Sequence, residues 1–234
     1  MLGLSLLERA VDYTQGSLRV VTRTALCRPT PCAGWTLGTL LAHLDDSLRA
    51  LREAADGDVA LAGRPSARAA RTPLLVRDTV ADVLTAWRHP FQMQGERDGA
   101  VQAGEPGAVR GERGCPGGAD DLLTTGWDGG PGVPEPGAAA QPCGGVGVGD
   151  RWLSRPVVAA VGAMEVAVHG WDVAAACGER RPMPDPLAEE LLDLAPLFVA
   201  PGDRPGRFAP AVQVMPYASA HERLLAYLGR DPHH

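Results

Sequence analysis

Leucines recur at helical spacing between Leu37 and Leu51, and this is the most regular hydrophobic pattern of the chain. They stand at i, i+3, i+4, i+7, i+11 and i+14: Leu37, Leu40, Leu41, Leu44, Leu48 and Leu51. This spacing forms the single apolar stripe of an amphipathic helix. Thr36 is a suitable N-cap, because its hydroxyl can accept from an N–H of the first turn. We expect this helix to fray around Asp56-Gly57.

Weaker periodicity and turn residues predict further helices before and after this one. The expected helices run from Leu4 to about Leu26, from Leu74 to Trp87, from Ser154 or Arg155 to a stop at Gly178, from Pro186 to Val199, and from Ala220 to Leu228. We expect no strand and no internal repeat. The pattern is typical of an all-α helix bundle.

The pattern breaks down between about residues 90 and 149. Residues 95–149 hold more than half of the 29 glycines of the chain and lack a sustained period. Such a composition buries too little apolar surface to offset the entropy of ordering it. We therefore predict one domain over residues 1–234, interrupted by a largely disordered Gly/Pro-rich insert. A frame-shifted reading of GC-rich DNA would give the same composition.

Composition restricts the classes of binding partner and the cellular compartment that we expect for this protein. The net charge of −6 and the pI near 5.5 argue against a nucleic-acid groove or an anionic membrane surface. Lysine, isoleucine and asparagine are all absent, which suggests a GC-rich, for example actinobacterial, genome. The N-terminus lacks the pattern of a signal peptide, and we expect no membrane span. The five cysteines lack CxxC spacing, so a cytoplasmic protein without a disulfide framework is expected.

Glu165 and His169 are the strongest candidates for chemistry. They lie four residues apart on a predicted helix, so their side chains share one face. A carboxylate and an imidazole at this spacing can bind one Zn²⁺, Fe²⁺, Ni²⁺ or Mn²⁺ ion. The alternative is a solvated hydrogen-bonded pair. His43 lies at the edge of its leucine stripe, where a histidine taken on its own is more often a satisfied boundary residue than a ligand.

Other polar residues leave alternatives open. Cys32 either approaches the metal, forms a mixed disulfide, or is a small buried cysteine in a loop. Asp172 either orients an imidazole or bonds to the backbone. We expect His221 on the polar face of a short surface helix. His233 and His234 form an exposed tail.

Two motifs resemble a known family. The run Thr30-Pro-Cys-Ala-Gly-Trp-Thr-Leu37, followed by Leu-Leu-Ala-His43-Leu, is similar to the signature of the mycothiol-dependent maleylpyruvate isomerase N-terminal family. This family is the actinobacterial branch of the DinB-like metal-binding bundles. The run Glu165-Val-Ala-Val-His169-Gly-Trp-Asp172 resembles its Glu-x-x-x-His-Gly-Trp-Asp element. The resemblance covers roughly residues 1–88 and 147–232.

The resemblance implies a DinB-like four-helix bundle with short extra helices and a metal ion, zinc above all, held by His43, Glu165 and His169. Three protein ligands leave a coordination position open. The implied co-substrate is mycothiol or a related thiol, and the implied partner is a small electrophile, in a monomer or homodimer. Ligand nitrogen-to-oxygen separations of about 3–4 Å would fit a shared ion.

The chain departs from the family in two ways. Its insert precedes the second ligand helix, and it leaves little room for the C-terminal domain of the isomerase proper. Our leading interpretation is therefore a metal- and thiol-dependent S-transferase or isomerase whose own substrate is open and whose further catalytic residues are unknown. One alternative is a non-catalytic metal-binding or sensing bundle. Another is a fold damaged by the insert, with no protected helix at 155–177.

Overall fold

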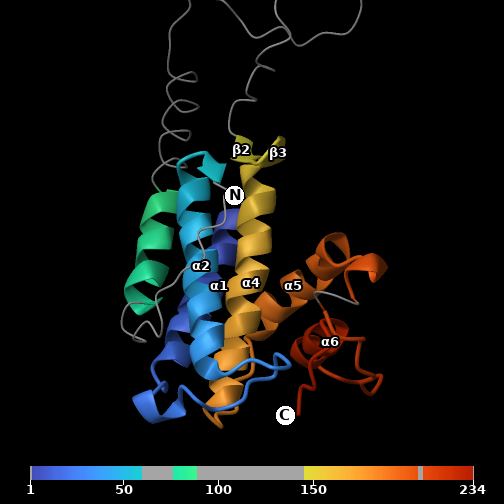
Figure 1. Cartoon of the computed structure of the whole chain (residues 1–234). Coiled ribbons are helices and arrows are strands. Elements are labelled where there is room, and N and C mark those ends of the chain that lie inside the picture. The colour runs from blue at the N-terminus through green and yellow to red at the C-terminus, as the bar shows by residue number, and fades with distance from the viewer. Residues whose placement is uncertain (1, 60–75, 89–144, 205–207, 234) are drawn as a thin grey trace, which may run out of the picture.

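The computed structural model describes residues 2–59, 76–88, 145–204 and 208–233, and this part of the chain is mostly helical (Figure 1). The longer helices are α1 (Leu2–Leu18), α2 (Leu37–Ala55), α4 (Arg155–Ala176) and α5 (Asp185–Phe198), and the shorter α6 covers Ala220–Tyr227. Residues 76–88 form a further helix. Two short 3-10 turns, η1 (Arg23–Ala25) and η2 (Pro201–Asp203), lie in the connections.

The helices α1, α2, α4 and 76–88 run alongside one another, while α5 and α6 lie to one side of α4 (Figure 1). The helices α2 and α4 run in opposite directions, so the first half of α2 faces the second half of α4. The predicted helical fold is therefore confirmed in its broad character. The DinB-like four-helix bundle and the single-domain organisation stay predictions.

The leucine stripe faces the core as predicted. Its members are buried together with apolar residues of α1, α4 and the helix at 76–88. The Thr36 hydroxyl accepts from the Thr39 backbone N–H at 3.3 Å, which confirms the predicted N-cap. Gly178 and Gly229 end α4 and α6 at φ +81°, a conformation that residues with a Cβ rarely adopt.

Helix α4 is the most deeply packed element. It is the one helix among the described residues that is long and apolar enough to cross a membrane, although none was expected from the sequence. However, 78% of its apolar window is buried within the protein. Its contacts with α1, α2 and α5 explain this hydrophobicity as that of a core helix.

A small sheet contradicts the expectation of no strand. It contains β1 (Asp58–Val59), β2 (Gly145–Val148) and β3 (Arg151–Ser154), with β2 antiparallel to β3 and parallel to β1. Strands of four residues are too short to display a period of two, and β2, with its two glycines, was included in the predicted insert. The insert prediction is therefore wrong for residues 145–149, and residues 89–144 lie outside the described part.

The first helix is shorter than predicted. It ends at Leu18, and a 3-10 turn at Arg23–Ala25 takes the place of its last turns. The intervening Val20, Val21 and Thr22 are β-branched, and such side chains lose rotamer freedom in a helix. This local preference accounts for the early end.

Candidate metal centre

The three residues predicted to bind the metal converge on one oxygen atom. His43 Nε2 lies 2.7 Å from Glu165 Oε1, and His169 Nε2 lies 3.3 Å from the same oxygen. The ligand atoms of all three residues lie within 4.8 Å of one another. The antiparallel packing of α2 against α4 brings His43 and Glu165 into contact, although they are 122 residues apart in the sequence.

This cluster is open on one side. The His43 and Glu165 side chains are 39% and 34% exposed, whereas the His169 side chain is 9% exposed. His169 therefore lies at the inner end of the cluster, and the other two side chains face solvent. A cluster with this exposure can admit a further small ligand.

Ser47 is a fourth contributor that the sequence did not reveal. It lies one turn beyond His43 on α2, and its hydroxyl donates to Glu165 Oε1 at 3.0 Å. The i,i+4 relation to His43 is a pattern that could have identified it. Its hydrogen bond fixes the carboxylate that both imidazoles approach.

The other nitrogen of His169 faces a buried ion pair. His169 Nδ1 lies 2.8 Å from Asp172 Oδ2, and Arg230 donates to both oxygens of this carboxylate, from Nε at 2.9 Å and from Nη2 at 2.8 Å. Asp172 thus orients an imidazole, the first of its two predicted alternatives. A proton on Nδ1 leaves the Nε2 lone pair free to bind a cation. Arg230 was missed, because no local spacing connects residues 172 and 230.

Cys32 lies on the same side of the imidazole as Asp172. Its Sγ is 3.3 Å from Asp172 Oδ2, 4.0 Å from His169 Nδ1 and 3.6 Å from Arg230 Nη2. Cys32, His169 and Asp172 are close enough to form a second metal-binding set. The Arg230 guanidinium already neutralises Asp172, so we assign this group a supporting role. The half-buried Cys32 lies next to the supporting carboxylate rather than beside His43 and Glu165.

The pKa directions follow from these contacts. Burial on its own would raise the pKa of Glu165, but hydrogen bonds from His169 and His43 hold it well below its ordinary value. Burial would lower the pKa of His169, but hydrogen bonds with Asp172, Cys32 and Glu165 raise it well above its ordinary value. Despite burial, Arg230 and His169 lower the pKa of Asp172 to about 2. Without a metal ion, these contacts favour an ionised Glu165 beside a protonated His169. A divalent cation would compete with the imidazole proton for the same place.

Trp35 contacts both imidazoles. Its ring centroid lies 5.0 Å from that of His43, in an edge-to-face arrangement, and 6.4 Å from that of His169, nearly parallel to it. Trp35 belongs to a short loop closed by the Thr30 N–H, which donates to the Trp35 carbonyl at 3.0 Å. Cys32 belongs to the same loop. The loop therefore contacts the ring face of His169 through Trp35 and its Nδ1 edge through Cys32.

His221 contradicts its prediction as a surface residue. It is 8% exposed, and its Nδ1 accepts from the Met183 backbone N–H at 3.3 Å. Trp171 of α4, whose ring centroid lies 6.2 Å from that of His221, and the segment at Met183 help to cover it, which a helix considered alone does not reveal. His233 is exposed as predicted, and its side chain lies 3.9 Å from Glu222, whereas His234 lies outside the described residues.

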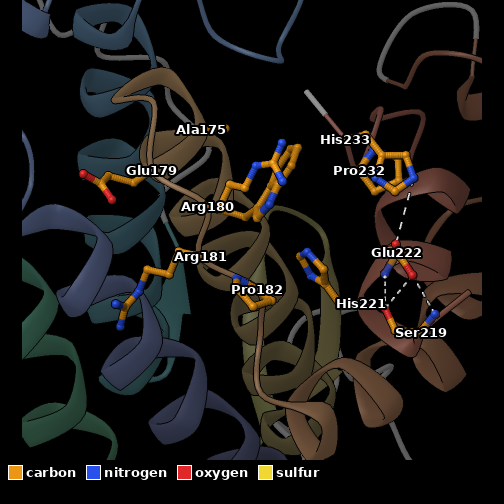
Figure 2. Close-up of a pocket in the computed structure, with 11 residues that line it drawn as sticks. Ala175, Glu179, Arg180, Arg181, Pro182, Ser219, His221, Glu222, Pro232 and His233 are labelled. Carbon is orange, nitrogen blue, oxygen red and sulfur yellow. Dashed lines mark hydrogen bonds and ion pairs between the residues drawn. The ribbon is translucent and has the colours of Figure 1, made fainter.

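A separate hollow lies between the end of α4 and α6 (Figure 2). None of the three predicted ligands lines it. Its rim combines Arg180 and Arg181 with Glu179 and Glu222, so it favours neither sign of ligand charge. Glu222 is also occupied by the cap of α6, since it accepts from the backbone and hydroxyl of Ser219 (Figure 2). We therefore do not associate this hollow with the metal centre.

The geometry defines a class of protein: a mostly helical domain with a histidine–glutamate–histidine cluster between two antiparallel helices. The family model of the mycothiol maleylpyruvate isomerase N-terminal domain matches residues 7–174, and the chain belongs to this family. The match includes His43, Glu165, His169 and Asp172, whereas Arg230 lies beyond it. No curated protein and no solved structure matches the chain.

Proposed function

We propose that this protein binds one divalent metal ion, most favourably zinc, through His43, Glu165 and His169. In this proposal a low-molecular-weight thiol, mycothiol or a relative, binds at the open side and reacts with a small electrophile by S-transfer or isomerisation. The DinB-like bundle is the proposed scaffold. Family membership supports a mycothiol-related, metal-binding domain. The observation that carries the ligand assignment is the convergence of two imidazoles on one oxygen of Glu165.

The donor set fits a borderline divalent cation. Two imidazole nitrogens and one carboxylate oxygen are common ligands of catalytic zinc. The 3.3 Å between His169 and Glu165 lies within the separation expected for a shared ion, and the 2.7 Å between His43 and Glu165 lies below it. The exposed His43 side chain can move outward by the small distance required. Asp172 would hold the inner ligand fixed meanwhile.

The open side favours a catalytic over a structural role. Structural zinc sites are closed by four protein ligands, whereas catalytic sites keep a position for water or substrate. A bound ion would supply Lewis acidity that lowers the pKa of a thiol and favours its reactive thiolate. His43 and Glu165 face solvent, so they can bracket an entering thiol. A cytoplasmic location, where such thiols stay reduced, is part of the proposal.

Metal content tests the ligand assignment. We expect wild-type protein purified without chelators to contain about one equivalent of metal and His169→Ala to contain almost none. His233→Ala is a matched control, because this histidine is exposed and outside the cluster. Equal metal in wild type and His169→Ala would refute the site.

Thiol conjugation tests the reaction. We expect mycothiol to react with model electrophiles faster in the presence of the metal-loaded protein, and a chelator to abolish the acceleration. Metal binding without thiol binding would instead support the non-catalytic metal-binding or sensing alternative. The third alternative, a damaged fold, predicts no protected helix at 155–177. The helix α4 over Arg155–Ala176 argues against it, and hydrogen exchange would test it.

A further inference from the structure

Trp35 is a large apolar residue that is only partly buried, although it packs against the core. Its indole lies beside two imidazoles whose centroids are themselves 5.0 Å apart and nearly perpendicular. The three rings thus form a corner, with the indole nearly parallel to His169 and steeply inclined to His43. All these separations are typical of favourable aromatic pairs.

Trp35 and His43 are both partly exposed and their rings are in contact, so the exposed part of this corner adjoins the solvent-facing part of the cluster. His43, the ring closest to Trp35, has 39% of its side chain exposed. A ligand that enters beside His43 and Glu165 therefore meets an indole. Aromatic contact areas of this kind favour flat, π-rich groups over saturated groups of equal size. The loop position of Trp35 also matches the usual location of binding residues on a rigid scaffold.

We propose that Trp35 is a specificity-determining residue that forms an aromatic wall beside the open coordination position. It selects ligands with a flat unsaturated or aromatic group next to the metal-bound atom. This inference rests on the proposed function, because it needs a metal ion and an open position at His43, Glu165 and His169. It adds a substrate class: small electrophiles or thiols with a conjugated or aromatic group.

The test uses full-length protein loaded with Co²⁺ and two thiols, phenylmethanethiol and cyclohexylmethanethiol. Each thiol has one methylene between ring and sulfur, so the pair differs chiefly in ring aromaticity. Binding is followed by the sulfur-to-cobalt charge-transfer absorption. In wild type we expect the aromatic thiol to bind about two- to tenfold more tightly. In Trp35→Leu the preference for the aromatic thiol should fall, and Trp35→Phe should keep part of it.

The ratio of the two affinities is an internal control, because misfolding weakens both thiols together. Trp152→Leu is a matched variant, since Trp152 is 40% exposed in β3 before α4 begins, and its ratio should equal that of wild type. Equal affinities in wild type, or an unchanged ratio in Trp35→Leu, would overturn the aromatic wall alone. Cobalt binding without a charge-transfer band for either thiol would overturn the open position and with it the wall.

Discussion

The two ring nitrogens of His169 each face a carboxylate, and the two carboxylates differ in burial and in their charged partners. At Nδ1 stands Asp172, which is completely buried and whose carboxylate is neutralised by Arg230. At Nε2 stands Glu165, whose side chain is 34% exposed. In the described part of the chain, Glu165 receives hydrogen bonds from imidazoles and from Ser47, and from no arginine. Arginine neutralises the carboxylate at the Nδ1 edge, and the proposed function places an external cation at the Nε2 edge.

This difference separates the roles of orientation and binding. A buried ion pair is costly to break, because removing one partner leaves an uncompensated charge. Glu165 is partly exposed and already ionised, so a metal ion that binds there has to displace only the proton of a neighbouring imidazole. We therefore expect substitutions at the Nδ1 edge to reduce stability and metal affinity together. Substitutions at the Nε2 edge should change metal binding with little effect on stability.

The largest expected effect is that of Arg230→Ala. It removes the guanidinium from a fully buried carboxylate and leaves Asp172 only its contacts with His169 and Cys32, so the free energy of unfolding of the metal-free protein should fall by about 3–5 kcal/mol. Urea denaturation measures this change. The control is Arg52→Ala, which breaks an exposed pair with Asp56 and should cost about 0.2–1 kcal/mol. Similar losses in the two variants would show that the Nδ1 edge is not specially stabilised.

Asp172→Asn should weaken metal binding by about ten- to a hundredfold. The amide can still accept one hydrogen bond, but it no longer fixes the proton of His169 on Nδ1. Nε2 is then less available as a ligand. A zinc titration against a chromophoric chelator measures the affinity, and circular dichroism checks that the variant is folded. An unchanged affinity in a folded variant would mean that Asp172 does not orient the metal ligand.

Local patterns predicted much of the helical structure. The leucine stripe, the Thr36 cap and the glycine stops are encoded within a few residues, and the structure reproduces them. The short hairpin at 145–154 was missed, because the preference of its glycines and valines depends on pairing with neighbouring strands. His221 was misplaced for a similar reason, since Trp171 and the backbone of Met183 contact it from other segments of the chain.

The site was predictable to different degrees for its different residues. Glu165 and His169 follow from spacing on one helix, whereas His43 entered through the family resemblance. Ser47 could have been predicted from the same i,i+4 spacing, because it lies four residues after His43 on α2. Arg230 contacts Asp172 across 58 residues, and Cys32 approaches it across 140. Such contacts depend on tertiary packing, so no local pattern in a single sequence reveals them.

Ser47→Ala should have a smaller effect than Asp172→Asn, restricted to the Nε2 edge. Loss of one hydrogen bond to Glu165 should weaken metal binding by about two- to tenfold. The free energy of unfolding of the metal-free protein should change by less than about 0.5 kcal/mol. Ser5→Ala on the exposed surface of α1 is the matched control. A large loss of stability in Ser47→Ala alone would erase the proposed difference between the two edges.

The smallest expected effect uses His221 as a reference, because no carboxylate among the described residues is hydrogen-bonded to this buried histidine, and Glu222 and Asp185 act on it only through their charge. Burial lowers the pKa of His221 below its ordinary value of 6.5, whereas the pKa of His169 is raised. A lowered folded-state pKa means that the unfolded chain binds the proton more tightly. The stability from neutral His221 is therefore present above pH 6.5 and is lost as the pH falls through the folded pKa. His169 in metal-free protein should behave oppositely, with stability present below 6.5 and lost as the pH rises through its folded pKa.

Comparison of wild type with His221→Gln isolates the His221 contribution. The difference between their free energies of unfolding should shrink as the pH falls from about 8 to about 5, because the wild-type advantage depends on neutral imidazole. Urea denaturation of metal-free protein at several pH values gives this difference, from which the contribution of His169 cancels. A difference that grows on acidification would mean that His221, like His169, is stabilised in its charged form. The two histidines would then not have opposite pKa directions, and the carboxylate beside His169 would not distinguish them.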